Sequence, residues 1–260
     1  MKPLQVLEVS RLGEAGHLFA GEARREGVTP SERITALGRE ISALASDLPL
    51  SANSSVFVAL DDEKMMLWRA VIVGPTDTPY AGGCFIFDLY FPPTYPQVCP
   101  QVKLKTTGGG KVRFNPNLYN CGKVCLSLLG TWMGEKGEGW LPKVSTANQV
   151  FLSIQSLILV DRPYFNEPGY ERTMGTPQGE ASSKSYNVTI REATLRYAMI
   201  DLLKHPPAEL EAIIKTHFRL RQSHILKCVD GWIADAAGNA SHASNLAHLK
   251  SELAACFKKL

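Results

Sequence analysis

The chain has 260 residues, of which 45% are hydrophobic and 20% charged, as in an ordinary globular protein rather than a disordered one. A net charge of +3 without a dense run of Lys and Arg argues against nucleic-acid binding. No apolar run approaches about 18 residues, which argues against a membrane span. Six cysteines without a Cys-x-x-Cys pair or a secretory leader favour a reducing compartment, so we expect a cytoplasmic location, with the nucleus as a further one.

The first third of the chain contains one clear helix signal. Residues 1–28 have scattered glycines and a weak apolar pattern, and we expect a leader or linker, or a frayed helix. Thr29-Pro30-Ser31-Glu32 is typical of a helix start with Thr29 as the cap, and apolar residues at helical spacing predict a helix up to Pro49. We expect its charged residues on a solvated surface; these are Arg33, Arg39 and Glu40.

Short β-type segments follow this helix. We predict four strands, at about 54–60, 65–73, 84–91 and 101–107, because turn residues separate them at short spacing. Alternation within 84–91 predicts one mostly apolar face, and the order of the segments predicts an antiparallel meander. The glycines at 108–110 resemble a phosphate loop, but the Lys-Ser/Thr and the helix that should follow are missing, so we expect a turn.

The second half of the chain is mainly helical. Ser145 or Thr146 is expected to cap a helix that runs through Val160, with five residues inward: Val150, Phe151, Ile154, Leu157 and Ile158. A polar stretch near 173–187 precedes predicted helices at about 188–204, 207–221, 222–236 and 243–258. We therefore divide the chain into a leader or linker (1–28), a core domain (29–205) and a C-terminal helical extension (206–260).

One segment, from Val112 to Leu129, combines an Asn-Pro-Asn turn with Gly-Lys-Val-Cys-Leu. Pro116 restricts the turn, and the amide of Asn117 can come close to the thiol of Cys125. This pairing suits acyl-thioester chemistry, in which a thiolate carries an acyl group and an amide N–H stabilises the oxyanion formed on transfer. The alternative from these residues is a buried structural cysteine beside a turn.

Other cysteine chemistry is less well supported. A zinc site would have to use Cys84, Cys99, Cys121 and Cys125, which lack the short spacing of zinc ribbons, so we expect neither a metal nor a cofactor. No His lies within 75 residues of Cys125, which weighs only weakly against a papain-like cysteine hydrolase, because a distant His could fold close. A cysteine hydrolase therefore stays a rival interpretation. Cys121 remains the rival thiol, four residues before Cys125.

The segment around Cys125 resembles the active-site segment of ubiquitin-conjugating enzymes, in which His-Pro-Asn precedes a Gly-x-x-Cys-Leu box. Over about 30–175 further motifs agree in order: Gly82–Phe87, Phe91–Pro96, Trp140-Leu141-Pro142, Gln149–Leu157 and Asn166-Glu167-Pro168. Over about 30–235 the chain is similar to the C-terminal conjugating domain of giant Apollon/BRUCE-type hybrid conjugating enzyme–ligases. That closer match is carried by Phe114–Tyr119, Tyr164–Arg172 and Gly175-Thr176-Pro177.

The resemblance implies an α+β, UBC-like fold: an N-terminal helix, a four-stranded antiparallel meander, the active-site segment, a central helix and C-terminal helices. It implies that Cys125 accepts ubiquitin from the ubiquitin-activating enzyme, which uses the ATP, and passes it to lysines of protein substrates. The N-terminal helix is expected to dock the activating enzyme. Alternatives are a non-catalytic variant that only binds ubiquitin and a carrier of another ubiquitin-like modifier.

The resemblance also assigns roles to individual residues. Asn117 is expected to support the oxyanion, and Glu167 to match an acidic position that orients the acceptor lysine and takes its proton. Auxiliary residues are Asn115, which replaces the family's His, Tyr119, and Ser127, which stands where many relatives carry Asp. Gln97 replaces a Phe that inserts into ligase partners, so we expect docking to conventional RING or HECT ligases to be disfavoured.

Overall fold

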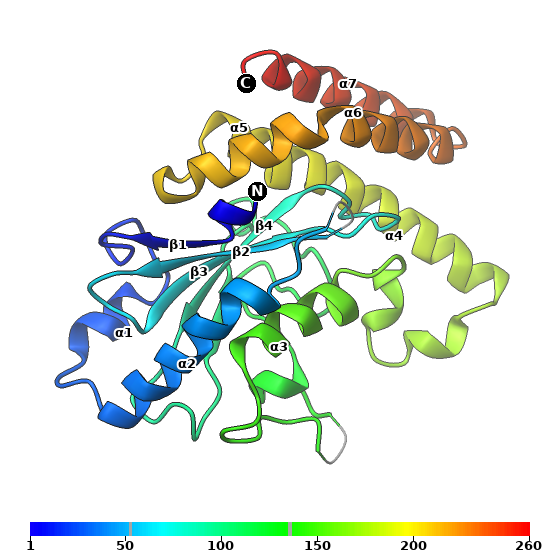
Figure 1. Cartoon of the computed structure of the whole chain (residues 1–260). Helices are drawn as coiled ribbons and strands as arrows, with labels where there is room; N and C mark the ends of the chain where they lie inside the picture. Colours follow the sequence, from blue (N-terminus) through cyan, green and yellow to red (C-terminus); the bar gives the residue numbers. More distant parts are fainter. Residues whose placement is uncertain (52–53, 135–136) are drawn as a thin grey trace.

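The structure is a computed structural model that describes residues 1–51, 54–134 and 137–260. In these residues the chain forms a five-stranded sheet with the order β1-β2-β3-β4-β5 (Figure 1). The strands are β1 (Val6–Val9), β2 (Val56–Asp61), β3 (Leu67–Val73), β4 (Cys84–Tyr90) and β5 (Gln101–Leu104). Strands β2 to β5 form the predicted antiparallel meander, whereas β1 pairs parallel to β2. The prediction of four strands was therefore one short.

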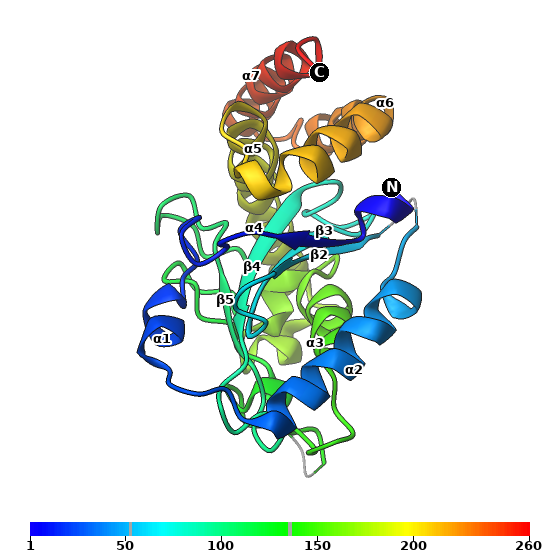
Figure 2. The same ribbon diagram turned by 60° about the vertical axis from the view of Figure 1, so that its left-hand side comes forward.

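Two helices cover one face of the sheet. They are α2 (Ser31–Asp47) and α3 (Ala147–Ser153), which lie on the same side of the sheet (Figure 2). Their apolar residues pack with alternate residues of β2, β3 and β4 in one core. As predicted, Thr146 caps α3, and Gln149 completes a capping box. A π-helical turn (Ile154–Ile158) continues α3. Because this turn changes the helical register, Leu157 is 59% exposed, and its predicted inward position was wrong.

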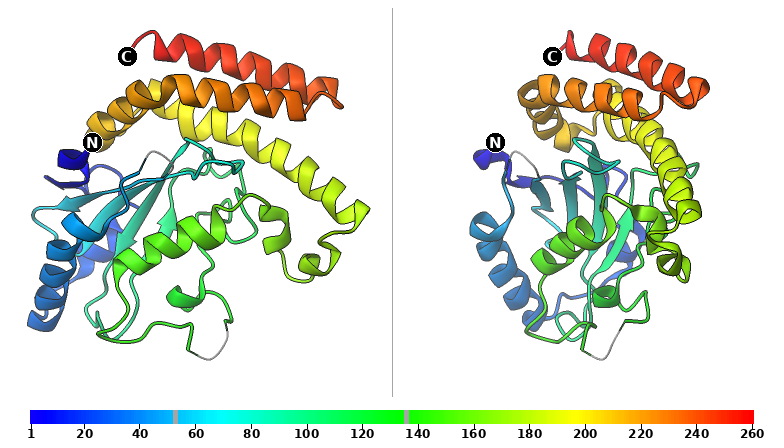
Figure 3. Two further views of the ribbon diagram at one scale, coloured as in Figure 1. Left: turned by 45° about the vertical axis from the view of Figure 1, so that its right-hand side comes forward. Right: turned by 90° about the vertical axis from the view of Figure 1, so that its right-hand side faces the viewer.

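The C-terminal helices lie on the opposite side of the sheet, with the last of them outermost (Figures 1 and 3). They are α4 (Pro177–Leu195), a π-helical turn (Arg196–Ile200), α5 (Asp201–Lys204), α6 (Glu211–Asp235) and α7 (Ala240–Phe257). The first of these begins earlier than predicted, because Thr176 caps it and Pro177 suits its first position. One continuous helix, α6, replaces the two predicted at 207–221 and 222–236, since no breaker separates them. None of the described helices is long and apolar enough to span a bilayer.

This second layer explains why the central strands are buried throughout. Every residue of β2, β3 and β4 is buried, although one mostly apolar face was expected for the third of these strands. Phe57, Val71 and Ile86 point away from α2 and belong to a core that includes Met199 and Phe218. The C-terminal extension thus forms a layer on the sheet.

Residues 1–28, expected to be a leader or linker, contribute to the same structure. They contain a short 3-10 helix (Lys2–Leu4), β1 and α1 (Ala20–Arg25), and they bury Leu12 and Phe19. The amide of Gln5 donates to the Leu48 carbonyl at 2.9 Å. The weak apolar pattern hid this arrangement, because so short a strand depends on its neighbour β2 more than on its own sequence.

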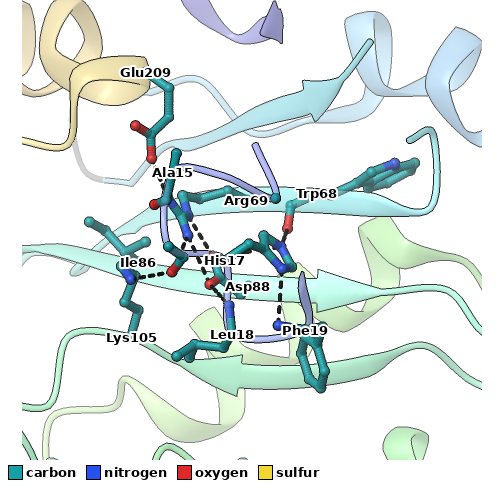
Figure 4. Close-up of polar contacts among 12 residues, drawn as sticks. Ala15, His17, Leu18, Phe19, Trp68, Arg69, Ile86, Asp88, Lys105 and Glu209 are labelled. Atoms are coloured by element: carbon teal, nitrogen blue, oxygen red, sulfur yellow. Dashed lines mark hydrogen bonds and ion pairs between the residues drawn. The ribbon is translucent and has the colours of Figure 1, made fainter. Parts of the chain in front are cut away.

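A cluster of buried polar side chains ties both ends of the chain to the sheet (Figure 4). Arg69 on β3 and Asp88 on β4 are paired across the ladder and joined by an ion pair, with Nε–Oδ1 at 2.5 Å. His17, from the N-terminal segment, hydrogen-bonds the Trp68 carbonyl and lies 3.8 Å from Asp88. Glu209, which precedes α6, completes the cluster with an ion pair to Arg69. Paired in this way, the charges remain compatible with burial.

Two charged residues of α2 are fully or half buried, contrary to the predicted solvated surface. Arg33 is fully buried, pairs with Glu26 and donates to the Phe91 carbonyl at 2.9 Å. Glu40 accepts hydrogen bonds from Tyr95 and from the Ala147 amide, and burial raises the pKa of this carboxyl. Arg39 is exposed as expected. The predicted Thr29 cap was wrong, because the N-cap is Pro30 and the hydroxyl of Thr29 instead accepts from Arg33.

Candidate active site

The segment that carries Cys125 is a short hairpin beside the edge strand β5. Leu118 pairs with Val124, and the Tyr119 amide donates to the Lys123 carbonyl at 3.0 Å. The hairpin is joined to β5 by a hydrogen bond of 2.8 Å from the Leu104 amide to the Gly122 carbonyl. At Gly122, φ is +87°, and a Cβ there would lie only 2.7 Å from the Leu104 oxygen. Only glycine fits this turn without distortion.

Asn115 lies at the base of this hairpin and is fully buried. Its Nδ2 donates to the Ile158 carbonyl at 2.7 Å and to the Tyr80 hydroxyl at 3.2 Å. Its Oδ1 accepts from the Asn117 amide at 2.8 Å. A buried amide with these partners fixes the turn against the end of the central helix. The residue that replaces the family's His is thus bonded to backbone groups at Ile158 and Asn117.

Asn117 is hydrogen-bonded to the backbone of Cys125, and the predicted approach of its amide to the Cys125 thiol stays a prediction. The side-chain amide of Asn117 donates to the Cys125 carbonyl at 3.0 Å, and the Cys125 amide donates to the Asn117 carbonyl at 2.9 Å. Cys125 is 2% exposed. Burial by itself also fits a structural cysteine, but the reciprocal bonds place an amide donor next to the residue that would carry the acyl group.

Glu167 reaches the same segment through a residue that the sequence analysis did not single out. Arg113 Nη2 contacts Glu167 Oε2 at 3.1 Å and also donates to the Pro116 carbonyl at 2.7 Å. The Arg113 guanidinium lies over the Tyr119 ring, 4.5 Å from its centroid. The sequence offered no signal for Arg113, because its partner Glu167 is 54 residues away.

Cys121 and Ser127 belong to the hairpin and the turn that follows it, whereas Gln97 precedes β5. Ser127 begins a 3-10 turn (Ser127–Leu129), is half-buried and lies close to Gly134. The Gly-rich loop between Trp132 and Trp140 includes residues 135–136, which lie outside the described residues. Cys121 is an exposed, unpaired thiol. Gln97 is exposed and donates to Glu32 at 3.1 Å. In the described part of the chain, no group of three or more His, Cys, Asp or Glu residues could hold a metal ion.

Residues 37–194 match the family model described as "Ubiquitin-conjugating enzyme". A human relative named "Dual E2 ubiquitin-conjugating enzyme/E3 ubiquitin-protein ligase BIRC6" is 48% identical over 219 residues, which are 84% of this chain and 4% of that protein. A Caenorhabditis elegans relative named "Probable ubiquitin-conjugating enzyme protein 17" is 42% identical over 249 residues, 92% of this chain and 34% of the relative.

A third relative, from Acanthamoeba polyphaga mimivirus, is named "Probable ubiquitin-conjugating enzyme E2 R521". It is 42% identical over 228 residues, which are 88% of this chain and 16% of the viral protein. The chain thus spans about a third or less of each of these three relatives. The match to a dual enzyme confirms the predicted similarity to hybrid conjugating enzyme–ligases. With a family model over more than half of its residues, the chain belongs to the ubiquitin-conjugating enzyme family.

Proposed function

We propose that this chain accepts ubiquitin as a thioester on Cys125 from the ubiquitin-activating enzyme and transfers it to lysines of protein substrates. The observation that carries this proposal is the adjacency of Asn117 and Cys125, joined by reciprocal hydrogen bonds inside a segment that belongs to this enzyme family. The same segment in a cysteine hydrolase would need a general base beside the thiol, and Cys125 has no hydrogen-bonded His in the described residues.

The proposed transfer has two steps that exchange one bond for another. In the first, the Cys125 sulfur attacks the thioester carbonyl on the activating enzyme, and the activating enzyme's thiol leaves. In the second, a lysine nitrogen attacks the carbonyl of the Cys125 thioester, and the Cys125 sulfur leaves. Asn117 supports the oxyanion in the second step, and Glu167 takes the proton that the lysine nitrogen loses. No bound cofactor takes part in this sequence.

The similarity to a dual enzyme supports a further proposal about partners. The human relative is named as both a conjugating enzyme and a ligase, and we propose that this chain does not depend on a conventional RING or HECT ligase. Gln97 supports this proposal, because a polar amide bonded to Glu32 offers no apolar group for insertion into a ligase. The unpaired state of the six cysteines supports a reducing location, which we propose to be the cytoplasm or nucleus.

A thioester assay tests the main proposal. The chain is incubated with ubiquitin-activating enzyme, ATP and ubiquitin, and the products are separated with and without reductant. We expect a reducible adduct in the wild type, a reductant-resistant oxyester in Cys125→Ser, and normal charging in Cys121→Ser. Loss of charging in Cys121→Ser would show that the assignment of the thioester to Cys125 is wrong. An adduct that forms only with another ubiquitin-like modifier would instead favour that alternative carrier.

A further inference from the structure

We propose, on the basis of the proposed function, that Arg113 is a positioning residue that holds the Glu167 carboxylate ready for the acceptor lysine. Glu167 follows a 3-10 turn (Pro163–Asn166), whereas Cys125 belongs to the hairpin beside β5. A single nitrogen, Arg113 Nη2, contacts Glu167 Oε2 at 3.1 Å and the Pro116 carbonyl at 2.7 Å. Arg113 therefore connects the loop that bears the carboxylate to the turn that leads to the thiol.

The Arg113 side chain is itself held in place from a second direction. Its guanidinium lies over the ring of Tyr119, and Lys123 Nζ lies 5.6 Å from the centroid of the same ring. The Tyr119 backbone is part of the hairpin that ends at Cys125. A planar guanidinium fixed by a ring, a carbonyl and a carboxylate has little freedom to turn. Arg113 thereby fixes the position of the Glu167 carboxylate relative to the segment that carries the thioester.

This contact leaves the carboxylate able to act. The ion pair uses Oε2 of Glu167, and an ionised carboxylate has two oxygens with about four acceptor sites. An approaching lysine ammonium can therefore bind the other oxygen. The guanidinium places a second positive charge near that ammonium, and a like charge favours the neutral, nucleophilic amine. Arg113 would thus assist both the orientation and the deprotonation of the acceptor.

Several ionisable groups lie around the Arg113–Glu167 pair. Tyr186, on α4, faces both side chains, and burial raises the pKa of Tyr186 to about 12, with Arg113 lowering and Glu167 raising it. Tyr119 and Lys123 lie on the hairpin side, and Glu171 with Arg172 follows Glu167 on its own segment. Because Tyr186 stays protonated below pH 10, a change in rate between pH 7 and pH 9 reports mainly on the acceptor amine.

The test is single-turnover discharge of the Cys125 thioester by free lysine and, in parallel, by hydroxylamine, an amine largely uncharged at pH 7. The variants are Arg113→Ala, Arg113→Lys, Glu167→Ala and the double alanine variant. We expect normal charging in all four. Discharge to lysine at pH 7 should fall up to about fivefold in Arg113→Ala, as for loss of one exposed ion pair, with partial recovery in Arg113→Lys. The double variant should be no slower than Glu167→Ala, and hydroxylamine discharge should change little.

A second ion pair of the chain offers a matched control. Arg162 and Glu180 form an ion pair of 3.3 Å whose side chains are 42% and 36% exposed, against 42% and 35% for Arg113 and Glu167. Arg162 also lies over a ring, that of Phe165. We expect Arg162→Ala to leave lysine discharge unchanged, because its carboxylate partner is not the one that serves the acceptor.

Several results would overturn the role of Arg113. One is lysine discharge in Arg113→Ala that matches or exceeds the wild-type rate. Another is an equal loss with hydroxylamine, which would indicate a distorted hairpin. A third is a loss in the double variant that equals the product of the losses in the two single variants, because this would show that Arg113 and Glu167 act independently. Failure of the wild type to charge at all would contradict the proposed function, and it is read out in a separate step before discharge begins.

Discussion

Asn117 serves the folded chain and, in our proposal, the reaction as well. Its amide donates to the Cys125 carbonyl at 3.0 Å, so it stabilises the hairpin before any substrate is bound. We expect Asn117→Ala to leave charging largely intact and to slow discharge to lysine by up to roughly 10²–10³. Oxyanion support matters most when an amine, the poorer nucleophile, attacks. Charging and single-turnover discharge are measured separately, and equal losses in both steps would point to a folding defect.

Glu167 gives a prediction that depends on pH. At pH 7 the acceptor amine is mostly protonated, since lysine has a pKa of about 10.4, so a carboxylate that positions it and takes its proton has a large effect. We expect Glu167→Ala to slow discharge to lysine at pH 7, and the defect to shrink toward pH 9–10 as free amine accumulates. Discharge rates of the wild type, Glu167→Ala and Glu167→Gln across this range provide the measurement. A defect that does not vary with pH would leave Glu167 a positional role only.

The sequence alone predicted some contacts between site residues and not others. Asn117 and Cys125 come from one continuous segment, so a turn and a short hairpin suffice to bring them together. The burial of Asn115 depends on Tyr80 and Ile158, which belong to distant parts of the chain. The same holds for Arg113 and its carboxylate partner. Contacts made by long-range packing leave no periodic signal in one sequence.

At the scale of elements, the hairpin depends on a close approach between two backbones. The Gly122 carbonyl accepts from the Leu104 amide, and a Cβ at position 122 would lie 2.7 Å from the Leu104 oxygen. We expect Gly122→Ala to move the hairpin away from β5, lowering the free energy of unfolding by roughly 1–3 kcal/mol and slowing charging. Thermal unfolding and the thioester assay check this. As a control, Gly109→Ala has a comparable φ of +68° but open space around it, and it should leave charging intact.

The elements themselves differ in how well their sequences specified them. The apolar spacing of α2 and the capping box of α3 predicted both helices, because each signal is local. The charges on α2 were misplaced, since Arg33 is buried against Glu26, which follows α1, and Glu40 is half-buried and bonded to Tyr95. Strand β1 was missed because four residues pair with β2 through the backbone, which any side chains permit. Local patterns predicted elements, whereas their packing partners determined which polar residues became buried.

For the whole molecule, two buried histidines make stability depend on pH. His217 on α6 hydrogen-bonds the Gly82 carbonyl at 2.9 Å, and burial lowers its pKa to about 4. Burial also lowers the pKa of His17. In the unfolded chain both histidines bind a proton near pH 6.5, whereas in the folded chain they bind it only at lower pH. The contribution to stability is thus present above pH 6.5 and is lost as the pH falls toward 4.

We expect His217→Gln to remove part of this dependence. The free energy of unfolding of the wild type should lose on the order of 3 kcal/mol more than that of the variant between pH 6.5 and pH 4. Urea unfolding at several pH values provides the measurement. The exposed His248 on α7 gives the control, because His248→Gln should keep the wild-type slope. Parallel curves for the wild type and His217→Gln would contradict the prediction.

The covering of the sheet on both faces has a consequence for amide hydrogen exchange. Strand β3 has β2 on one side and β4 on the other, and helical layers lie above and below it. Its amides can reach deuterated solvent only when both layers and both neighbouring strands open together, so their exchange should report global unfolding. The hairpin that ends at Cys125 is joined to β5 by few backbone bonds and should exchange through small local openings. The slowest and the faster exchanging amides would then divide the molecule into a rigid centre and a more easily opened catalytic rim.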